Sequence, residues 1–438
     1  MLTISQMDPN HFQVAIIGAG PAGLMAAITA AERGRRCVLI EKNRKVGVKI
    51  LISGGSRCNL THDTDAKGII EAFGRNGRFL HSALHQLGPT DVLDFFHGEG
   101  VATKREPNGK IFPATDKALH VQQALLNRLQ RTDCVLANQH AVEKLEVIEG
   151  LFHLQTDKQN FVAEKVVLAT GGLSYAGCGT TGDGYPWLEQ LGHKLAPRFP
   201  ALVPVCLQDD WLSALSGISL VDCQIGVVEE REWSKATDLP GYQAVVRKKS
   251  LIDRRAPLLF THKGLSGPAA MDVSRAVSSS GSPQRLRMVI DLAPDWPVAM
   301  LMDDLERAIA EEGSRTIGRW LSQKMQPYDV ADRLLFASLQ RSDVPANQKL
   351  AELNRNQKHH AIVAVKFLTA TPTGTLGYPK AEVTMGGVEL NEVNPKTMES
   401  KRTPGLFLCG EILNLDGRIG GFNFQAAFST GFTAGQSV

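Results

Sequence analysis

The stretch FQVAIIGAGPAG, residues 12–23, decides the fold of this chain. Its apolar first half is rich in β-branched residues and predicts a buried strand, and its second half is a G-x-G-x-x-G turn. A helical pattern over 24–33 follows, and an apolar segment over 36–40 then ends on Glu41. This order of strand, glycine turn, helix, strand and acid predicts a βαβ unit that binds a dinucleotide.

The residues of this unit have separate roles in binding. Gly18 permits the tight turn, Gly20 lets the backbone approach a pyrophosphate, and Gly23 lets the helix pack closely on the sheet. The helix N-terminus offers unpaired N–H groups to the phosphates. Glu41 can accept hydrogen bonds from a ribose diol and would repel a 2′-phosphate, which disfavours an NADP-type adenosine. We expect cofactor contacts from Gly18, Gly20, Pro21, Ala22, Gly23, Glu41 and Lys42.

Length and composition limit the class of protein. A chain of 438 residues predicts two or three domains, and 43% hydrophobic with 21% charged residues is typical of a soluble globular enzyme. The net charge of +3 does not require a nucleic-acid partner. The seven cysteines contain no C-x-x-C pair, residues 1–8 lack a signal-peptide pattern, and no apolar run reaches membrane-spanning length. We expect a cytoplasmic protein with no membrane span, no redox-active dithiol and no metal site.

A second glycine-rich turn lies near the C-terminus. Residues 403–411, TPGLFLCGE, predict a turn and a short buried strand, and residues 416–427, DGRIGGFNFQAA, lead into a C-terminal helix. An NAD-only domain needs no second site, whereas the flavin end of FAD must be held by another segment. The arrangement resembles the glutathione-reductase-like flavoproteins. This resemblance implies that Glu411 binds the ribityl–pyrophosphate region and that the helix N-terminus stabilises the reduced flavin at its N1–C2=O edge. The implied contacts are Gly410, Glu411, Gly420, Gly421, Asn423, Phe424, Gln425 and Ala426.

A third segment, VVLATGG over 166–172, predicts a buried strand that ends in a glycine turn, after an antiparallel stretch over 141–162. The same superfamily places this element beside the adenosine and the flavin. The resemblance implies contacts from Val142, Ala169, Thr170 and Gly171.

Four motifs narrow the family. SGGSRCN at 53–59, ATGGLS at 169–174, LFTHKGLSGP at 259–268 and VTMGGV at 383–388 resemble the BaiN/RdsA-like flavoproteins over nearly the whole chain. The resemblance implies FAD and contacts from Lys49, Ser53, Gly54, Gly55 and Arg57. We expect the FAD to be bound non-covalently, because no His or Cys is clearly placed to bond the flavin. Members of this family are linked to aminoacetone oxidation, steroid-ring reduction and dihydrouridine formation in large-subunit ribosomal RNA. The chain departs from the commonest form at Ser56, where a third glycine is usual, and in an extra polar stretch over 229–255.

The predicted fold class is α/β: a Rossmann-like FAD-binding domain with an inserted β-barrel plus helical domain. The FAD-binding domain is discontinuous, over 1–195 and 371–438. The insert has a β-rich part over 196–296 and a helical subdomain over 297–370. Because the insert leaves and re-enters near the cofactor, we expect its inner face to close over the flavin, with His262 and the turn at 264–268 in the cleft.

A further literal G-x-G-x-x-G occurs at 177–182. It does not directly follow a strand, and no second strand with an acid lies at the required distance. We expect this loop, with Asp183 and Gly184, to cover the cofactor. An NAD(P)H reductant would then dock transiently on the flavin face.

Catalytic side chains are harder to predict, since the flavin carries the hydride chemistry. Cys58 follows Arg57, whose guanidinium would lower the thiol pKa and favour an acid or nucleophile; alternatively, Cys58 packs under the flavin. Lys49 either contacts the flavin N5 or a phosphate, or is a solvated loop lysine. His262 is either a general acid or a turn-stabilising residue.

Five cationic side chains near the insert are relevant to which partner the protein binds. Together they would neutralise phosphates of ribosomal RNA, or they form a solvated loop: Arg247, Lys248, Lys249, Arg254 and Arg255. Three functions therefore stay open: an FAD-dependent oxidoreductase of a small molecule, which we favour, an FAD-dependent dihydrouridine synthase of large-subunit ribosomal RNA, and a non-catalytic flavin-carrying binding protein. The sequence predicts neither the substrate nor the oligomeric state.

Overall fold

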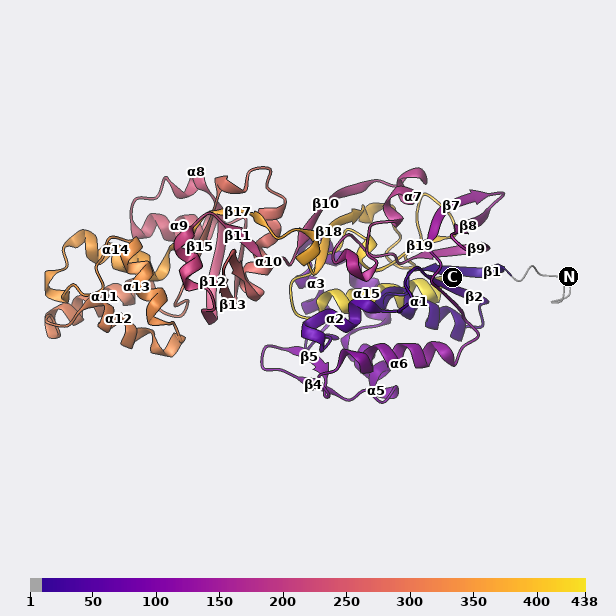
Figure 1. Ribbon diagram of the computed structural model, residues 1–438, viewed down its shortest axis with the longest axis horizontal. Helices are drawn as coiled ribbons and strands as arrows, with labels where there is room; N and C mark the ends of the chain where they lie inside the picture. The colour runs from indigo at the N-terminus through magenta and orange to yellow at the C-terminus, as the bar shows by residue number, and fades with distance from the viewer. Residues whose placement is uncertain (1–9) are drawn as a thin grey trace. The chain divides into compact units, whose positions relative to one another are not determined.

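The computed structural model describes residues 10–438. Residues 1–9, where the sequence shows no signal-peptide pattern, lie outside the described residues. The chain folds into two compact units (Figure 1): unit 1 combines the N-terminal part up to Phe199 with 382–438, and unit 2 comprises 200–381. No helix within residues 10–438 is long and apolar enough to cross a membrane.

Unit 1 is built on a seven-stranded sheet with a parallel centre. The strand order is β6-β2-β1-β9-β8-β7, and β19 also pairs with β9. These strands are β1 (His11–Ile17), β2 (Cys37–Glu41), β6 (Val135–Asn138), β7 (Val142–Ile148), β8 (Leu151–Thr156), β9 (Asn160–Leu168) and β19 (Leu406–Leu408). β1 contains the buried apolar run 14–17 and β2 the buried apolar run 37–40, because both faces of a parallel sheet are covered. The predicted Rossmann-like α/β architecture is confirmed.

The first and last helices of unit 1 pack against each other at short distance. They are α1 (Pro21–Glu32) and α15 (Phe422–Ser437), drawn side by side in Figure 1. A Cβ added to Gly431 would lie 2.2 Å from Ala22 O, and one added to Gly435 would lie 2.6 Å from the Ala26 carbonyl oxygen. The two glycines, one helical turn apart, therefore bring the C-terminal helix onto the helix of the first βαβ unit.

Further elements surround this sheet. The helices are α2 (Val48–Ser56), α3 (Ala66–Ala72), α4 (His81–Gln86), α5 (Pro89–Gly98), α6 (Ala118–Gln130) and α7 (Gly184–Gln190). A small antiparallel sheet contains β3 (Thr61–His62), β4 (Thr103–Arg105) and β5 (Lys110–Pro113), and a two-stranded sheet pairs β10 (Leu195–Ala201) with β18 (Val383–Val388). One continuous apolar cluster joins the main sheet to its helices.

Unit 2 contains a second seven-stranded sheet, which is antiparallel throughout. Its order is β16-β15-β12-β13-β14-β11-β17. The strands are β11 (Val205–Leu207), β12 (Ser219–Glu229), β13 (Ile252–Thr261), β14 (Gly264–Ser266), β15 (Leu286–Asp291), β16 (Leu368–Ala370) and β17 (Pro372–Thr375). Only Thr371 separates the two edge strands, β16 and β17, in the sequence. The end of β16 and the start of β17 therefore lie close together.

The helices of unit 2 are α8 (Glu230–Trp233), α9 (Leu239–Lys249), α10 (Gly267–Ser278), α11 (Val298–Glu311), α12 (Ile317–Met325), α13 (Asp332–Arg341) and α14 (Arg355–Lys366). The extra polar stretch over 229–255 forms α8 and α9 and the strands beside them. Unit 2 ends at 381, later than the sequence-based boundary at 370, because β17 pairs with β11 of the same sheet.

Candidate functional site

The first glycine turn has a closed side and an open side. A Cβ at Gly18, whose φ is +97°, would lie 2.6 Å from Ala169 O, and a Cβ at Gly23 would lie 1.8 Å from the Gly18 carbonyl oxygen. A Cβ at Gly20 would have no atom of residues 10–438 within 4 Å beyond its own chain neighbours. Packing therefore requires glycine at positions 18 and 23, whereas Gly20 faces open space at the start of α1, where unpaired N–H groups gather.

Glu41 is fixed at the end of β2 by backbone donors. Its Oε2 accepts a hydrogen bond from Ala19 N at 2.9 Å, and its Oε1 accepts one from Asn43 N at 2.8 Å. A carboxylate offers about four lone-pair sites. The buried side chain thus lies against the glycine turn and retains acceptor capacity for a ribose diol.

The loop with the second G-x-G-x-x-G pattern is tied to the segment after Glu41. The Lys42 ammonium contacts Asp183 and lies 2.5 Å from Thr181 Oγ1, while Asn43 Nδ2 donates to Cys178 O at 3.0 Å. A short helix, α7, follows this loop, and the next strand, β10, pairs within residues 10–438 only with β18. The loop therefore belongs to no second βαβ unit and packs against the end of β2.

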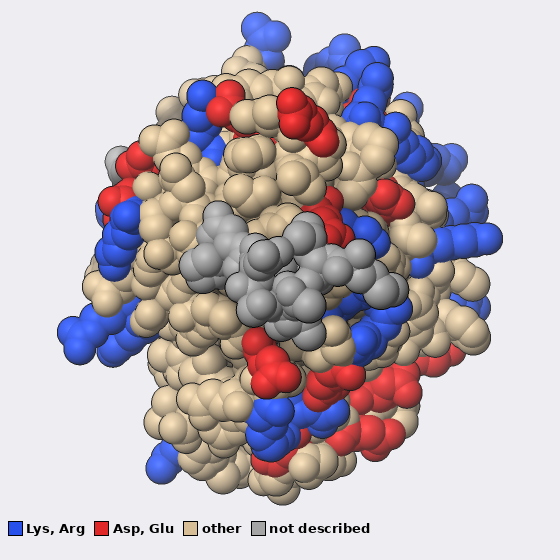
Figure 2. Space-filling model, turned by 90° about the vertical axis from the view of Figure 1, so that its right-hand side faces the viewer, with Lys and Arg blue, Asp and Glu red and all other residues tan. Residues whose placement is uncertain are grey.

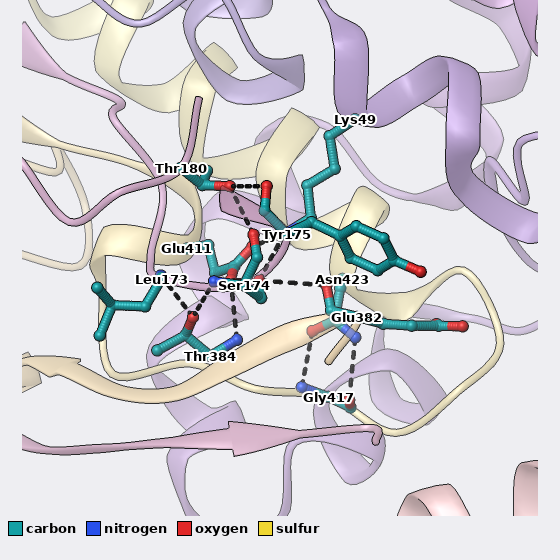
Figure 3. Close-up of polar contacts among 10 residues, drawn as sticks. All are labelled: Lys49, Leu173, Ser174, Tyr175, Thr180, Glu382, Thr384, Glu411, Gly417 and Asn423. Carbon is teal, nitrogen blue, oxygen red and sulfur yellow. Dashed lines mark hydrogen bonds and ion pairs between the residues drawn. The ribbon is translucent and has the colours of Figure 1, made fainter. Parts of the chain in front are cut away.

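A polar network joins four segments that are distant in the sequence (Figure 3). Lys49 Nζ lies 2.6 Å from Glu411 Oε2 and donates to Ser174 Oγ at 2.8 Å. The Ser174 hydroxyl donates to Glu411 Oε1 at 2.7 Å, and Thr384 N donates to the same oxygen at 2.8 Å. The Thr384 hydroxyl oxygen accepts from the backbone N–H groups of Leu173 and Ser174. These contacts join α2, the turn after β9, β18 and the turn after β19.

In this network Lys49 and Glu411 are already bonded to each other and to neighbouring protein groups. The two side chains neutralise each other, and both oxygens of Glu411 accept protein hydrogen bonds. Contact of Lys49 with the flavin N5 or a phosphate, and of Glu411 with the ribityl–pyrophosphate region, stay predictions. Sequence reasoning gave no role to Ser174 or Thr384, although both belong to motifs that it singled out.

Two amide side chains at the N-terminus of α15 form hydrogen bonds to other parts of the protein. Asn423 accepts from Gly417 N at 2.8 Å and donates to Gly417 O at 2.9 Å (Figure 3). Gln425 is fully buried, accepts from Thr61 Oγ1 and donates to Leu87 O. Both amide side chains hold the loop, so the groups this end of the helix offers to a ligand are its first-turn N–H groups.

The remaining predicted contact residues lie around the same elements. Gly171, Gly410, Gly420 and Gly421 all have positive φ, and a Cβ at Gly421 would lie 2.5 Å from Thr61 O. Val142 begins β7, Ala169 and Thr170 follow β9, Pro21 and Ala22 begin α1, and Phe424 and Ala426 lie in the first two turns of α15.

The loop over 53–59 contains a sharp break inside α2. Ser53 is extended, and Gly54, Gly55, Ser56 and Cys58 all have positive φ. The predicted lowering of the Cys58 pKa by Arg57 is wrong, because Cys58 is completely buried and this burial raises its thiol pKa to about 12. The Arg57 guanidinium instead lies 2.6 Å from Glu106 Oε1 and 3.9 Å from the centre of the Phe112 ring. Packing, the alternative for Cys58, fits this geometry.

Two buried polar atoms fit the presence of a ligand in unit 1. Asn59 Oδ1 and Thr170 Oγ1 have no hydrogen-bond partner within residues 10–438. Buried polar atoms are normally paired. Both atoms lie in segments predicted to contact FAD, and together with the open face of Gly20 they match a bound dinucleotide.

His262 lies in unit 2, in the turn between β13 and β14, and its side chain is exposed. It lines an open cavity of about 320 Å³ with Cys206, Leu207, Asp209, Leu212, Lys263 and Gly264. A role for His262 as a general acid toward the flavin stays a prediction.

The prediction that the five cations near the insert act together as one basic cluster is wrong. Arg254 and Arg255 are neighbours in β13, so their side chains point to opposite faces of the sheet. Arg254 Nε lies 2.8 Å from Asp272 Oδ2, and Arg255 Nη2 lies 2.6 Å from Asp222 and 2.5 Å from an Asp295 oxygen. These acids raise the pKa of Arg255 and neutralise its charge.

Three cations of the predicted cluster remain unpaired. Arg247, Lys248 and Lys249 form the exposed last turn of α9 and make no ion pair with any residue of 10–438. On the face of unit 1 shown in Figure 2, Lys and Arg gather toward the upper right and Asp and Glu toward the lower right.

Comparisons with known proteins extend over the whole chain. The family model described as HI0933-like protein Rossmann domain matches residues 12–437. The chain is 31% identical to the ribosomal RNA dihydrouridine synthase of Escherichia coli (strain K12), over 98% of each chain. It is 30% identical to the 3-dehydro-bile acid delta(4,6)-reductase of Clostridium scindens, over 97% of this chain and 98% of the relative.

One solved structure supports the fold. The open conformation of a flavocytochrome c3 fumarate reductase aligns with a TM-score of 0.50 and 16% identity, over 99% of this chain and 79% of the other. At this identity the likeness concerns the fold alone.

Proposed function

Because the chain belongs to the HI0933-like Rossmann-domain family of FAD-dependent oxidoreductases, as its motifs predicted, we propose that it reduces a carbon–carbon double bond conjugated to a carbonyl group. The names of its relatives share this chemistry. Dihydrouridine is uridine whose ring double bond, conjugated to a carbonyl, is saturated, and a delta-4 double bond of a 3-dehydro bile acid is conjugated to the 3-oxo group. A small molecule with this grouping is the substrate that we favour.

The observation that carries this proposal is that unit 1 contains both the open glycine turn at Gly20 and the N-terminus of α15. Gly20 would receive the pyrophosphate and Glu41 the ribose. The first-turn N–H groups of α15, at the positive end of the helix dipole, would face the negative charge of a reduced flavin and stabilise it. FAD, when bound, supplies the hydride chemistry of the reaction.

We expect the FAD to be held without a covalent bond. Cys58, the predicted nucleophile nearest the flavin, is completely buried, with its thiol pKa raised to about 12. NAD(P)H would act as a transient reductant on the flavin face, since the loop over 177–182 has no βαβ context.

Uridine in ribosomal RNA is the second candidate substrate. The unpaired cations Arg247, Lys248 and Lys249 support it, because exposed cations can neutralise phosphates. Cations also stabilise the C-terminal end of a helix, where these three residues lie, and this explains them without RNA. We therefore favour a small molecule over ribosomal RNA as the substrate.

The test starts from purified protein, from which heat should release FAD into the supernatant. The bound flavin is then reduced without oxygen and mixed with a conjugated cyclic ketone, its saturated analogue, or a uridine-containing ribosomal RNA fragment. We expect reoxidation by the conjugated ketone and none by the saturated one.

The outcomes separate the three functions. Reoxidation by RNA alone, together with loss of ribosomal dihydrouridine in cells that lack the gene, would establish the second candidate. Released FMN, or no flavin, contradicts FAD binding. Bound FAD that no substrate reoxidises would instead favour a non-catalytic flavin carrier.

A further inference from the structure

Reduction of a conjugated double bond requires a proton as well as a hydride. We propose that Tyr175 is the catalytic residue that donates this proton; the inference rests on the proposed function. A hydride, which reduced FAD would supply, goes to the β-carbon of the substrate, the carbon–carbon π bond breaks, and the proton of Tyr175 Oη goes to the α-carbon. Tyr175 is left as a phenolate, which takes a proton from water.

Three other proton donors in this part of unit 1 are engaged or inaccessible. Cys58 is completely buried with a raised thiol pKa. Lys49 donates to Ser174 and to Glu411, and its charge is needed there to balance the carboxylate. Ser174 is itself buried, and its hydroxyl proton is committed to Glu411. None of these three side chains is free to donate the proton.

Tyr175 directly follows Ser174 and has a strained backbone. Its φ of +56° is in the left-handed region, where a bulky side chain is rare. Two hydrogen bonds to its carbonyl oxygen hold this conformation, from Cys178 N at 2.8 Å and from Thr180 Oγ1 at 3.2 Å. Strain of this kind is concentrated at functional sites.

The consequence of this backbone is the direction of the ring. Ser174 points into the contacts with Glu411, whereas the Tyr175 ring extends away from them, with its hydroxyl at the far end (Figure 3). The ring is half-buried, and the hydroxyl has no hydrogen-bond partner within residues 10–438. A phenol is thus presented beside the segments predicted to hold the flavin, with its proton uncommitted. Tyrosine is an established general acid.

The experiment uses the FAD-loaded protein and the variant Tyr175→Phe, which keeps the ring and removes the hydroxyl. Tyr185→Phe is the matched control, because Tyr185 is a buried tyrosine of the neighbouring helix α7. His262→Gln tests the alternative donor in unit 2.

Two measurements are made on each variant. The first is the fluorescence lifetime of bound FAD, since an excited flavin accepts an electron from an adjacent tyrosine but not from phenylalanine. We expect a longer lifetime in Tyr175→Phe only. The second is reoxidation of the reduced flavin by the conjugated ketone. We expect a loss of about 10²- to 10⁴-fold in rate, with substrate affinity nearly unchanged.

An unchanged flavin lifetime in Tyr175→Phe overturns the placement of Tyr175 beside the flavin. An unchanged reoxidation rate overturns proton donation, as does an equal loss in Tyr185→Phe or a loss confined to His262→Gln. Failure of the wild-type protein itself to reduce any conjugated carbonyl overturns the proposed function, which distinguishes that failure from failure of the variant.

Discussion

Lys49 Nζ lies 2.6 Å from Glu411 Oε2, although 362 positions separate the two residues in the sequence. Both side chains are about one-fifth exposed, at 21% and 18%. The ion pair connects the segment after the first βαβ unit to the C-terminal turn, so it joins two segments that are both predicted to contact FAD.

Replacing Lys49 by Met should lower the free energy of unfolding by about 1–3 kcal/mol, because it leaves a largely buried carboxylate without its cation. Glu411→Gln should cost a similar amount. The double variant should cost less than the sum of the two. Denaturant unfolding of all three variants checks this, and simple additivity would show that the pair is not coupled.

Gly20→Val should leave the apoprotein folded and abolish FAD retention. No atom of residues 10–438 outside the adjoining chain crowds the position of a Cβ at Gly20, so the side chain would occupy the space that a pyrophosphate needs. Gly23→Ala is the contrasting variant, because its Cβ would lie 1.8 Å from Gly18 O and should disrupt folding. Circular dichroism with flavin content separates the two effects. Full flavin occupancy in Gly20→Val would rule out this turn as the phosphate site.

Ser56→Gly should raise the free energy of unfolding by about 1 kcal/mol. Ser56 has a φ of +67°, a conformation that costs a residue with a side chain about 1–2 kcal/mol, and glycine's greater freedom in the unfolded chain offsets part of the gain. Ser56→Ala retains the strain and is the control. A Ser56→Gly protein no more stable than Ser56→Ala would contradict this account.

Stability should fall as the pH drops below about 7, partly through His193. Its Nδ1 lies 3.1 Å from Glu392 Oε2, and its Nε2 lies 2.9 Å from Ser400 Oγ. Burial is the main cause that lowers the pKa of His193 below 6.5, although Glu392 opposes it.

The sign follows from proton binding. Between the folded and unfolded pKa values the unfolded chain binds more protons, so the stability present above pH 6.5 is lost as the pH falls toward the folded pKa, by at most about 1.4 kcal/mol per unit for one proton. His193→Gln should flatten this slope in pH-dependent unfolding. Some slope should remain, because burial also lowers the pKa of His62 and His359. An identical slope in the variant would exclude His193.

The sequence by itself determined the βαβ unit, the glycine turn and the acid after the second strand. These features depend on local rules: apolar runs set the strands, and a missing Cβ at Gly18 and Gly23 permits a turn that no other residue allows. The apolar pattern within 403–411 likewise predicted a short buried strand, which the structure forms as β19 beside β9. Spacing along the chain was sufficient for each of these conclusions.

Only the tertiary structure decided which charges and thiols are available. Arg57 is adjacent to Cys58 in sequence, but it pairs with Glu106 while the thiol is buried, so proximity along the chain did not give proximity of the functional groups. Arg255 was counted with the cations of α9, yet two aspartates distant in the sequence neutralise it. Burial and ion pairing depend on which distant segments meet, and the spacing of residues along one chain does not record that.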